Sequence, residues 1–187
     1  MFLFFVSVEK QRLSDFENGV TDAREITQAF AKADRIRLQE IDRVVNVLAR
    51  GDVFSKYWDI FENGNLLTGG NSESLIIDPV SFLGEDGGGF ETYDPVVYVL
   101  NDDVRKIAAV LSEINEKQFK EAFDAKMKKL TKYSFLSKKK KALKEKAPEI
   151  YEHFWNEFEI LRNFYQKVNE TDHLIVIFSM YEEEDFG

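Results

Sequence analysis

The chain has 187 residues, of which 44% are hydrophobic and 14% aromatic, enough apolar mass for one folded domain spanning residues 1–187. It has 25 basic and 34 acidic residues, a formal net charge of −9, and no cysteine. This composition argues against disorder and excludes disulfides, thiolate nucleophiles and cysteine metal sites. No apolar stretch reaches the roughly 20 residues of a membrane span, and the start lacks the basic region of a signal peptide. We therefore expect a cytoplasmic protein with no membrane partner.

The N-terminal run Phe2–Val8 is continuously apolar and is typical of a buried β-strand. Ser14 is a plausible N-cap for a short helix that ends near Gly19. These patterns predict a strand and then a short helix that begins at Ser14.

Asp22, with Glu25 three residues later, forms a capping-box pattern that predicts the start of the next helix. Apolar residues then recur at helical spacing as far as Gly51, the natural stop. The apolar stripe slips near Arg35 and Arg37, so the region could hold one helix or two.

Residues 52–62 predict a short aromatic helix, and residues 63–92 predict a long Gly-rich loop region. Seven of the ten glycines lie between Gly64 and Gly89. Loops of this length in a compact domain are more often functional than idle.

The residues 93–100 are rich in Val and Tyr and predict a strand. Asn101 or Asp102 is expected to cap the helix that follows, and a second helix is expected from Glu116.

Residues 132–147 read as a Lys-rich connector, and a long helix is expected after Pro148. The apolar run Leu174–Met180 predicts a central strand. Together these elements predict an α/β (α+β) fold with a small mixed sheet of about three or more strands and about five helices, in a three-layer-like arrangement.

The net charge is unevenly distributed. The segment Lys117–Lys146 holds 12 lysines and three acidic residues, so the rest of the chain carries −18. Complementary charge drives fast association, and we expect an acidic surface that masks a basic protein partner. Nucleic acid is not the expected partner, because an acidic body repels it. The Lys-rich segment, which has no arginine, is the one candidate surface for a nucleic-acid accessory.

Familiar catalytic and cofactor motifs are missing from the sequence. The Gly-rich segment 84–89 lacks the lysine of a phosphate-binding loop and carries Glu85 and Asp86, which would repel phosphate. His153 lies between Glu149 and Glu157 at helical spacing, which is better explained by surface pairing than by a metal site. We expect neither a metal nor a cofactor, and no recognisable enzyme activity.

One region combines a cluster of aromatic residues, a Gly-containing turn and acidic residues of the Gly-rich loop. These features suit a ligand or peptide pocket. The candidate binding residues at this cleft edge are Trp58, Thr68, Gly69, Glu85, Asp86 and Tyr93. Ordinary core aromatics followed by a loop would explain the same pattern. A small carboxylate-based enzyme acting under the Gly-rich loop is the alternative to a binding module.

The order and spacing of several residues resemble the YfbM-like family, a small bacterial family described as a domain of unknown function. The resemblance covers roughly residues 58–180. It rests on Trp58, the Leu-Leu-Thr-Gly turn at 66–69, the Tyr-Asp-Pro step at 93–95, the helix through Ile107-Ala108, the Ile150-Tyr151 step and the Phe164-Tyr165 pair.

This chain departs from that family pattern at Asp94 and Val97, where the family has Gly and Arg. If the Arg serves an anionic ligand elsewhere in the family, this chain has lost it. The resemblance implies an α/β domain in a bacterial cytoplasm and brings no reaction, substrate or cofactor.

Overall fold

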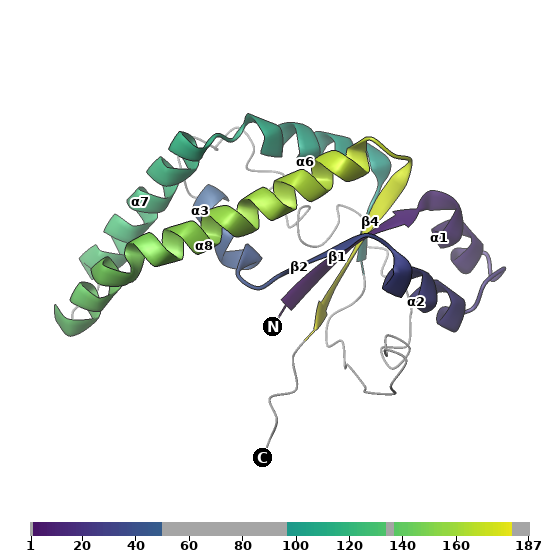
Figure 1. The fold of residues 1–187 in the computed structure, drawn as a ribbon, viewed down its shortest axis with the longest axis horizontal. Coiled ribbons are helices and arrows are strands. Elements are labelled where there is room, and N and C mark those ends of the chain that lie inside the picture. Colours follow the sequence, from purple (N-terminus) through teal and green to yellow (C-terminus); the bar gives the residue numbers. More distant parts are fainter. Residues whose placement is uncertain (1, 50–96, 134–136, 181–187) are drawn as a thin grey trace, which may run out of the picture.

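The computed structural model describes residues 2–49, 97–133 and 137–180, drawn as coloured ribbon in Figure 1. The helix expected at 52–62 and the Gly-rich loop at 63–92 lie outside the described residues.

The first strand is β1 (Phe2–Glu9), as its apolar run predicts. The chain enters helix α1 (Lys10–Glu17) without a loop, so Ser14 lies inside this helix and the prediction that it is the N-cap is wrong. The helix ends as expected: Asn18 is the C-cap and Gly19 follows with φ of +69°. Glycine adopts this left-handed conformation without the steric cost that a Cβ would bring.

Helix α2 (Ala23–Lys32) begins at the predicted capping box, since the Asp22 side chain accepts a hydrogen bond of 2.8 Å from the backbone N–H of Glu25. The slip in the apolar stripe near Arg35 is neither a kink nor a helix junction. It is a four-residue strand, β2 (Arg35–Leu38), after which helix α3 (Ile41–Ala49) begins. Pairing with β1 supplies the backbone hydrogen bonds that make a strand of this short charged stretch.

Strand β3 (Val97–Val99) lies within the strand expected at 93–100, of which residues 93–96 are outside the described residues. Helix α6 (Asn101–Glu113) follows, with Leu100 at the N-cap position and no side-chain cap, so neither Asn101 nor Asp102 caps it as expected. Asp102 and Asp103 lie in its first turn, where carboxylates favour the helix dipole.

Helix α7 (Glu116–Tyr133) begins at the expected residue. Helix α8 (Ser137–Asn169) was expected to start after Pro148, but it starts 11 residues earlier and runs through this proline. Residues 137–147, expected as part of a connector, are therefore helical. Lysine and alanine are good helix formers, which favours a helix over this stretch.

The final strand, β4 (His173–Met180), pairs along its whole length with β1. The sheet order is β2-β1-β4-β3, and every described pairing is antiparallel. The expectation of a mixed sheet is wrong. The two long strands come from opposite ends of the described chain and enter the sheet in opposite directions, so no parallel crossover is needed.

The two central strands are buried on both faces, which explains why their sequences are continuously apolar. On one face Phe5, Ile175 and Ile177 join a core built with α3, α6, α7 and α8. On the other face Val6, Val8, Leu174, Val176 and Phe178 pack against α1 and α2. The domain is therefore a single α+β domain with helices on both sides of one sheet, as Figure 1 shows.

Helix α7 and the first half of α8 lie antiparallel and extend away from the sheet (Figure 1). We call these two segments, residues 116–133 and 137–155, the α7–α8 hairpin. At 18 residues, α7 is about 27 Å long. Among the described residues, no helix is long and apolar enough to cross a lipid bilayer.

Candidate functional site

The site residues chosen from the sequence lie outside the described residues. They are Trp58, Thr68, Gly69, Glu85, Asp86 and Tyr93. Their assembly into a cleft, and the carboxylate enzyme proposed as an alternative there, stay predictions. The described part of the chain presents a different candidate, a groove between the two helices of the hairpin.

The start of α7 is fixed by a reciprocal cap. The backbone N–H of Gln118 donates to the side chain of Asn115, and the backbone N–H of Asn115 donates to the side chain of Gln118, both at 3.0 Å. This is the capping box with Asn and Gln in its two positions. It sets the rotation of α7 so that Phe119 and Phe123 turn towards α8 and are buried.

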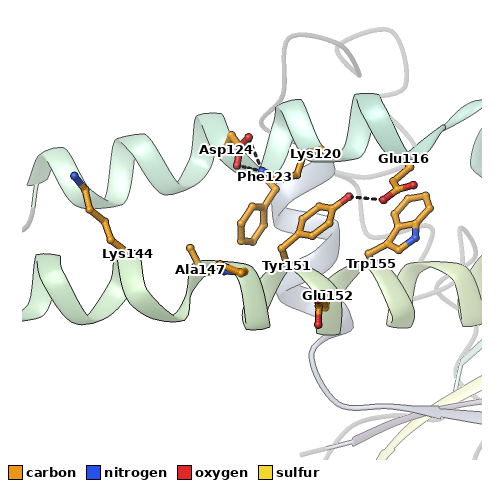
Figure 2. Close-up of a pocket in the computed structure, with 10 residues that line it drawn as sticks. Glu116, Lys120, Phe123, Asp124, Lys144, Ala147, Tyr151, Glu152 and Trp155 are labelled. Atoms are coloured by element: carbon orange, nitrogen blue, oxygen red, sulfur yellow. Dashed lines mark hydrogen bonds and ion pairs between the residues drawn. The ribbon is translucent and has the colours of Figure 1, made fainter.

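The groove has a volume of about 440 Å³. Ten residues line it: Glu116, Lys120, Phe123, Asp124, Lys144, Ala147, Pro148, Tyr151, Glu152 and Trp155. Figure 2 shows the aromatic side chains of Phe123, Tyr151 and Trp155 between the helices, with Lys144 far from Trp155. This size and lining suit a side chain or a small ligand.

The aromatic floor of the groove is continuous with the core. The ring of Phe123 meets that of Tyr151 edge-on at 5.4 Å between centroids. Phe119, fully buried, packs against Trp155 at 5.2 Å and against Phe158 at 5.3 Å. Tyr151 and Trp155 are only partly buried, so each offers some ring surface to the groove. Such packing holds the rings in fixed orientations.

Cations of the chain already lie over two of these rings. The Lys120 ammonium lies 5.1 Å from the centroid of Tyr151, and the Arg162 guanidinium lies 5.5 Å from that of Trp155. The Lys120 ammonium also donates to both carboxylate oxygens of Asp124. The groove thus pairs aromatic faces with carboxylates, the combination that binds cationic side chains.

Tyr151 also contacts a carboxylate directly, because its hydroxyl donates to Glu116 at 3.4 Å. Burial raises the pKa of Tyr151 above its usual value, and the nearby charge of Glu116 adds to the effect. The phenol therefore stays a neutral donor at neutral pH.

The charge along the hairpin reverses near the groove. The hairpin root, residues 116–124 and 145–155, contains six acidic residues and three lysines. The hairpin tip, residues 125–133 and 137–144, contains nine lysines and no acidic residue. The sequence had shown one Lys-rich segment, and the fold separates it into a basic tip and an acidic root that holds the groove.

A serine and a histidine also meet in the fold, since the hydroxyl of Ser7 lies 2.8 Å from Nδ1 of His173. In a Ser-His-Asp catalytic triad, Nε2 of the histidine accepts the proton of the serine hydroxyl, and the aspartate accepts a hydrogen bond from the Nδ1–H of the same histidine. Here Nδ1 faces the serine, so the contact ties β1 to the start of β4 and resembles no triad.

His153 pairs with Glu157 one turn along α8, with Nε2 at 3.7 Å from the carboxylate. The pair is not the surface pair that was expected, because Glu157 is buried. Among the described residues, no group of three His, Cys, Asp or Glu side chains could hold a metal ion.

The sequence placed Tyr151 in the family pattern but did not predict this groove. A signal was present. Tyr151 and Trp155 are one turn apart, and acidic residues flank them on the same helix. The sequence predicted α7 but not the part of α8 before Pro148, where a connector was expected, and so it did not predict a groove between the two helices.

The architecture defines the class of protein: one antiparallel sheet with a helix layer on each face. The structure of a protein of unknown function from Escherichia coli, YfbM, has a similar fold, with a TM-score of 0.53 and 12% identity, covering 97% of this chain and 100% of that one. A family model described as a domain of unknown function (DUF1877) matches residues 1–178, and the chain belongs to that family. A search of curated proteins finds no match to this chain.

Proposed function

We propose that this chain is a non-catalytic interaction module that binds a basic segment of a protein partner in the groove of the α7–α8 hairpin. The observation that carries the proposal is the groove itself, in which partly buried aromatic rings lie beside carboxylates. Shape, ring faces and charge there all suit a lysine or arginine side chain.

The contacts inside the chain support this choice of occupant. Lys120 already lies over the ring of Tyr151 while bound to Asp124, so the groove accommodates an ammonium group in the proposed way. Lys120 and Asp124 are about half exposed, which lets an incoming cation displace the internal one at little desolvation cost. The acidic hairpin root would attract a basic partner, and salt would weaken that attraction.

The acidic excess of the whole chain fits the same partner. The described residues contain 23 basic and 21 acidic residues, so the excess of acidic residues belongs to residues 50–96 and 181–187. The proposed setting is the bacterial cytoplasm, with which a chain free of cysteine is compatible.

Trp155 provides a direct test. The chain has two tryptophans, Trp58 and Trp155, so a Trp58→Phe variant leaves a single fluorophore in the groove. We expect a short arginine-rich peptide to change its emission saturably, and an acidic peptide of equal length to leave it unchanged. The absence of any change with the basic peptide at low salt would refute the proposal.

A pair of charge-matched variants locates the binding. Glu116→Gln with Glu152→Gln removes two carboxylates from the groove and no core side chain. We expect this double variant to weaken peptide binding about fivefold or more, as the loss of two close charges predicts. Glu25→Gln with Glu170→Gln removes the same charge from exposed positions elsewhere and should bind as the parent does.

The same variants test natural partners. A basic protein captured from a lysate by the parent chain should be lost with the Glu116/Glu152 variant and retained with the Glu25/Glu170 variant. Equal capture by all three proteins would place the interaction outside the groove and contradict the proposal.

A further inference from the structure

The tip of the α7–α8 hairpin is a second surface with the opposite charge from the root. All nine charged residues of the tip are lysines. Lys141 lies 3.8 Å from the carboxylate of Glu145, at the start of the root. Lys128 and Lys129 on α7 are exposed, as are Lys141 and Lys144 on α8. Two antiparallel helices thus present cations side by side.

The position of this surface changes the expectation drawn from net charge. A chain with a net charge of −9 should repel a polyanion at long range. However, the hairpin extends away from the sheet (Figure 1), and salt screens charges farther than about 8–10 Å at physiological ionic strength. Charges beyond that distance have little effect on what binds at the tip.

We infer that the hairpin tip binds the phosphodiester backbone of duplex nucleic acid without reading its sequence. The backbone of a duplex carries one charge per about 1.7 Å, and each lysine that contacts a phosphate releases condensed counterions. The surface holds lysine and no arginine, which favours point-charge contacts to phosphate over bidentate recognition of a base.

An anionic lipid surface is less well matched to what the tip presents. Stable peripheral binding to lipid combines cations with apolar side chains that enter the bilayer. On the described part of the tip, one large apolar residue, Leu130, is strongly exposed, at 47%. A single leucine gives little apolar area, so the observations favour a purely electrostatic partner.

The test is the fluorescence anisotropy of a labelled, random-sequence duplex DNA titrated with the full chain. We expect binding at about 50 mM salt that weakens steeply by about 200 mM, with equal affinity for an unrelated sequence. No binding at the lower salt concentration would overturn the inference, and so would a strong preference for one sequence.

Charge-matched variants place the contact. One variant changes four lysines of the tip to glutamine, namely Lys128, Lys129, Lys141 and Lys144. We expect it to lower the affinity for duplex DNA at least tenfold. It should also reduce the slope of log affinity against log salt by up to about 4. A control variant changes four exposed cations of α1, α2 and β2 to glutamine, namely Lys10, Arg24, Lys32 and Arg35, and should bind as the parent does. Equal losses in both variants would overturn the inference, because net charge alone would then explain the binding.

Vesicles of zwitterionic lipid with and without phosphatidylglycerol complete the test. Binding to the anionic vesicles in the absence of duplex binding would refute nucleic acid as the partner. The inference does not rest on the groove: the Glu116/Glu152 variant leaves every lysine of the tip in place and should bind the duplex at least as well as the parent chain.

Discussion

The carboxylate of Glu157 accepts a hydrogen bond of 2.8 Å from the backbone N–H of Glu40, a residue 117 positions earlier in the chain. Its other oxygen accepts one of equal length from the backbone N–H of Gln39. Glu157 is 5% exposed, so helix α8 uses a buried charge to hold the residues that lead into α3. These two bonds fix the position of α3 against the rest of the helix layer.

Replacing Glu157 with glutamine should lower the free energy of unfolding by about 1–3 kcal/mol. A glutamine has one acceptor oxygen, so its amide group would face one of the two N–H donors and leave it unsatisfied. Urea unfolding measures the change. Glu152→Gln, at an exposed position on the same helix, should stay within about 0.5 kcal/mol of the parent, and an equal effect of both changes would contradict this role for Glu157.

Phe119 should be among the most sensitive positions of the hairpin. It is fully buried and its ring contacts those of Tyr151, Trp155 and Phe158. Phe119→Ala is expected to cost about 3–5 kcal/mol through lost burial and the cavity it leaves.

Thermal or urea unfolding of the Phe119→Ala variant checks this value, and Trp155 emission should shift as its neighbour is removed. Leu130→Ala is the control at an exposed apolar position of α7. A cost below about 1 kcal/mol for Phe119→Ala would show that the hairpin packs much more loosely than the structure indicates.

Pro148 lies inside α8 and has no backbone N–H for the carbonyl of Lys144. Pro148→Ala should restore this bond and increase stability by up to about 3 kcal/mol, the difference in helix propensity. Hydrogen exchange of residues 137–147 should become slower. Unchanged or faster exchange in this segment would show that the proline does not weaken the first turns of α8.

Asp34 and Lys167 form an exposed ion pair between the end of the α2 segment and α8, with 2.6 Å between Oδ2 and Nζ. The hydrogen bond and charge of Lys167 hold the pKa of Asp34 below its ordinary value of 3.8. A depressed pKa stabilises the folded state above pH 3.8, and this contribution is lost as the pH falls through the folded-state pKa.

Lys167→Gln should therefore raise the pKa of Asp34 towards its ordinary value and remove that part of the acid dependence. An NMR titration of the Asp34 carboxyl carbon measures it. Both side chains are two-thirds exposed, so the effect on stability should be small. An unchanged pKa would mean that the pair does not persist in solution.

The sequence predicted those elements whose signals are local. The apolar runs at Phe2–Val8 and Leu174–Met180 predicted strands because each is only seven residues long and rich in aromatic or β-branched residues, whereas a buried helix is usually longer. The box of Asp22 and Glu25 predicted a helix start from hydrogen bonds within four residues. In the same way, the positions of α6 and α7 followed from helical spacing.

The sequence did not predict features that depend on distant residues. Strand β2 forms from a charged stretch because β1 lies beside it and supplies partners for its backbone. Helix α8 passes through Pro148 because α7 packs along it, although propensity alone would end a helix there. The buried charge of Glu157 has no sequence signal, since both of its partners lie more than 100 residues away.

For the candidate site too, some features could be predicted from the sequence and others depended on contacts between distant residues. By itself the sequence determined the composition, the net charge of −9, the dense lysines of residues 117–146 and the aromatic character of α8. Only the tertiary structure decided that α7 and α8 lie antiparallel. This packing gathers nine lysines towards the tip of the hairpin and forms between the helices an aromatic groove lined by three carboxylates and by Lys120 and Lys144. Charge and hydrophobicity are properties of residues, whereas a binding surface is set by which helices pack together, and that depends on contacts between residues far apart in the chain.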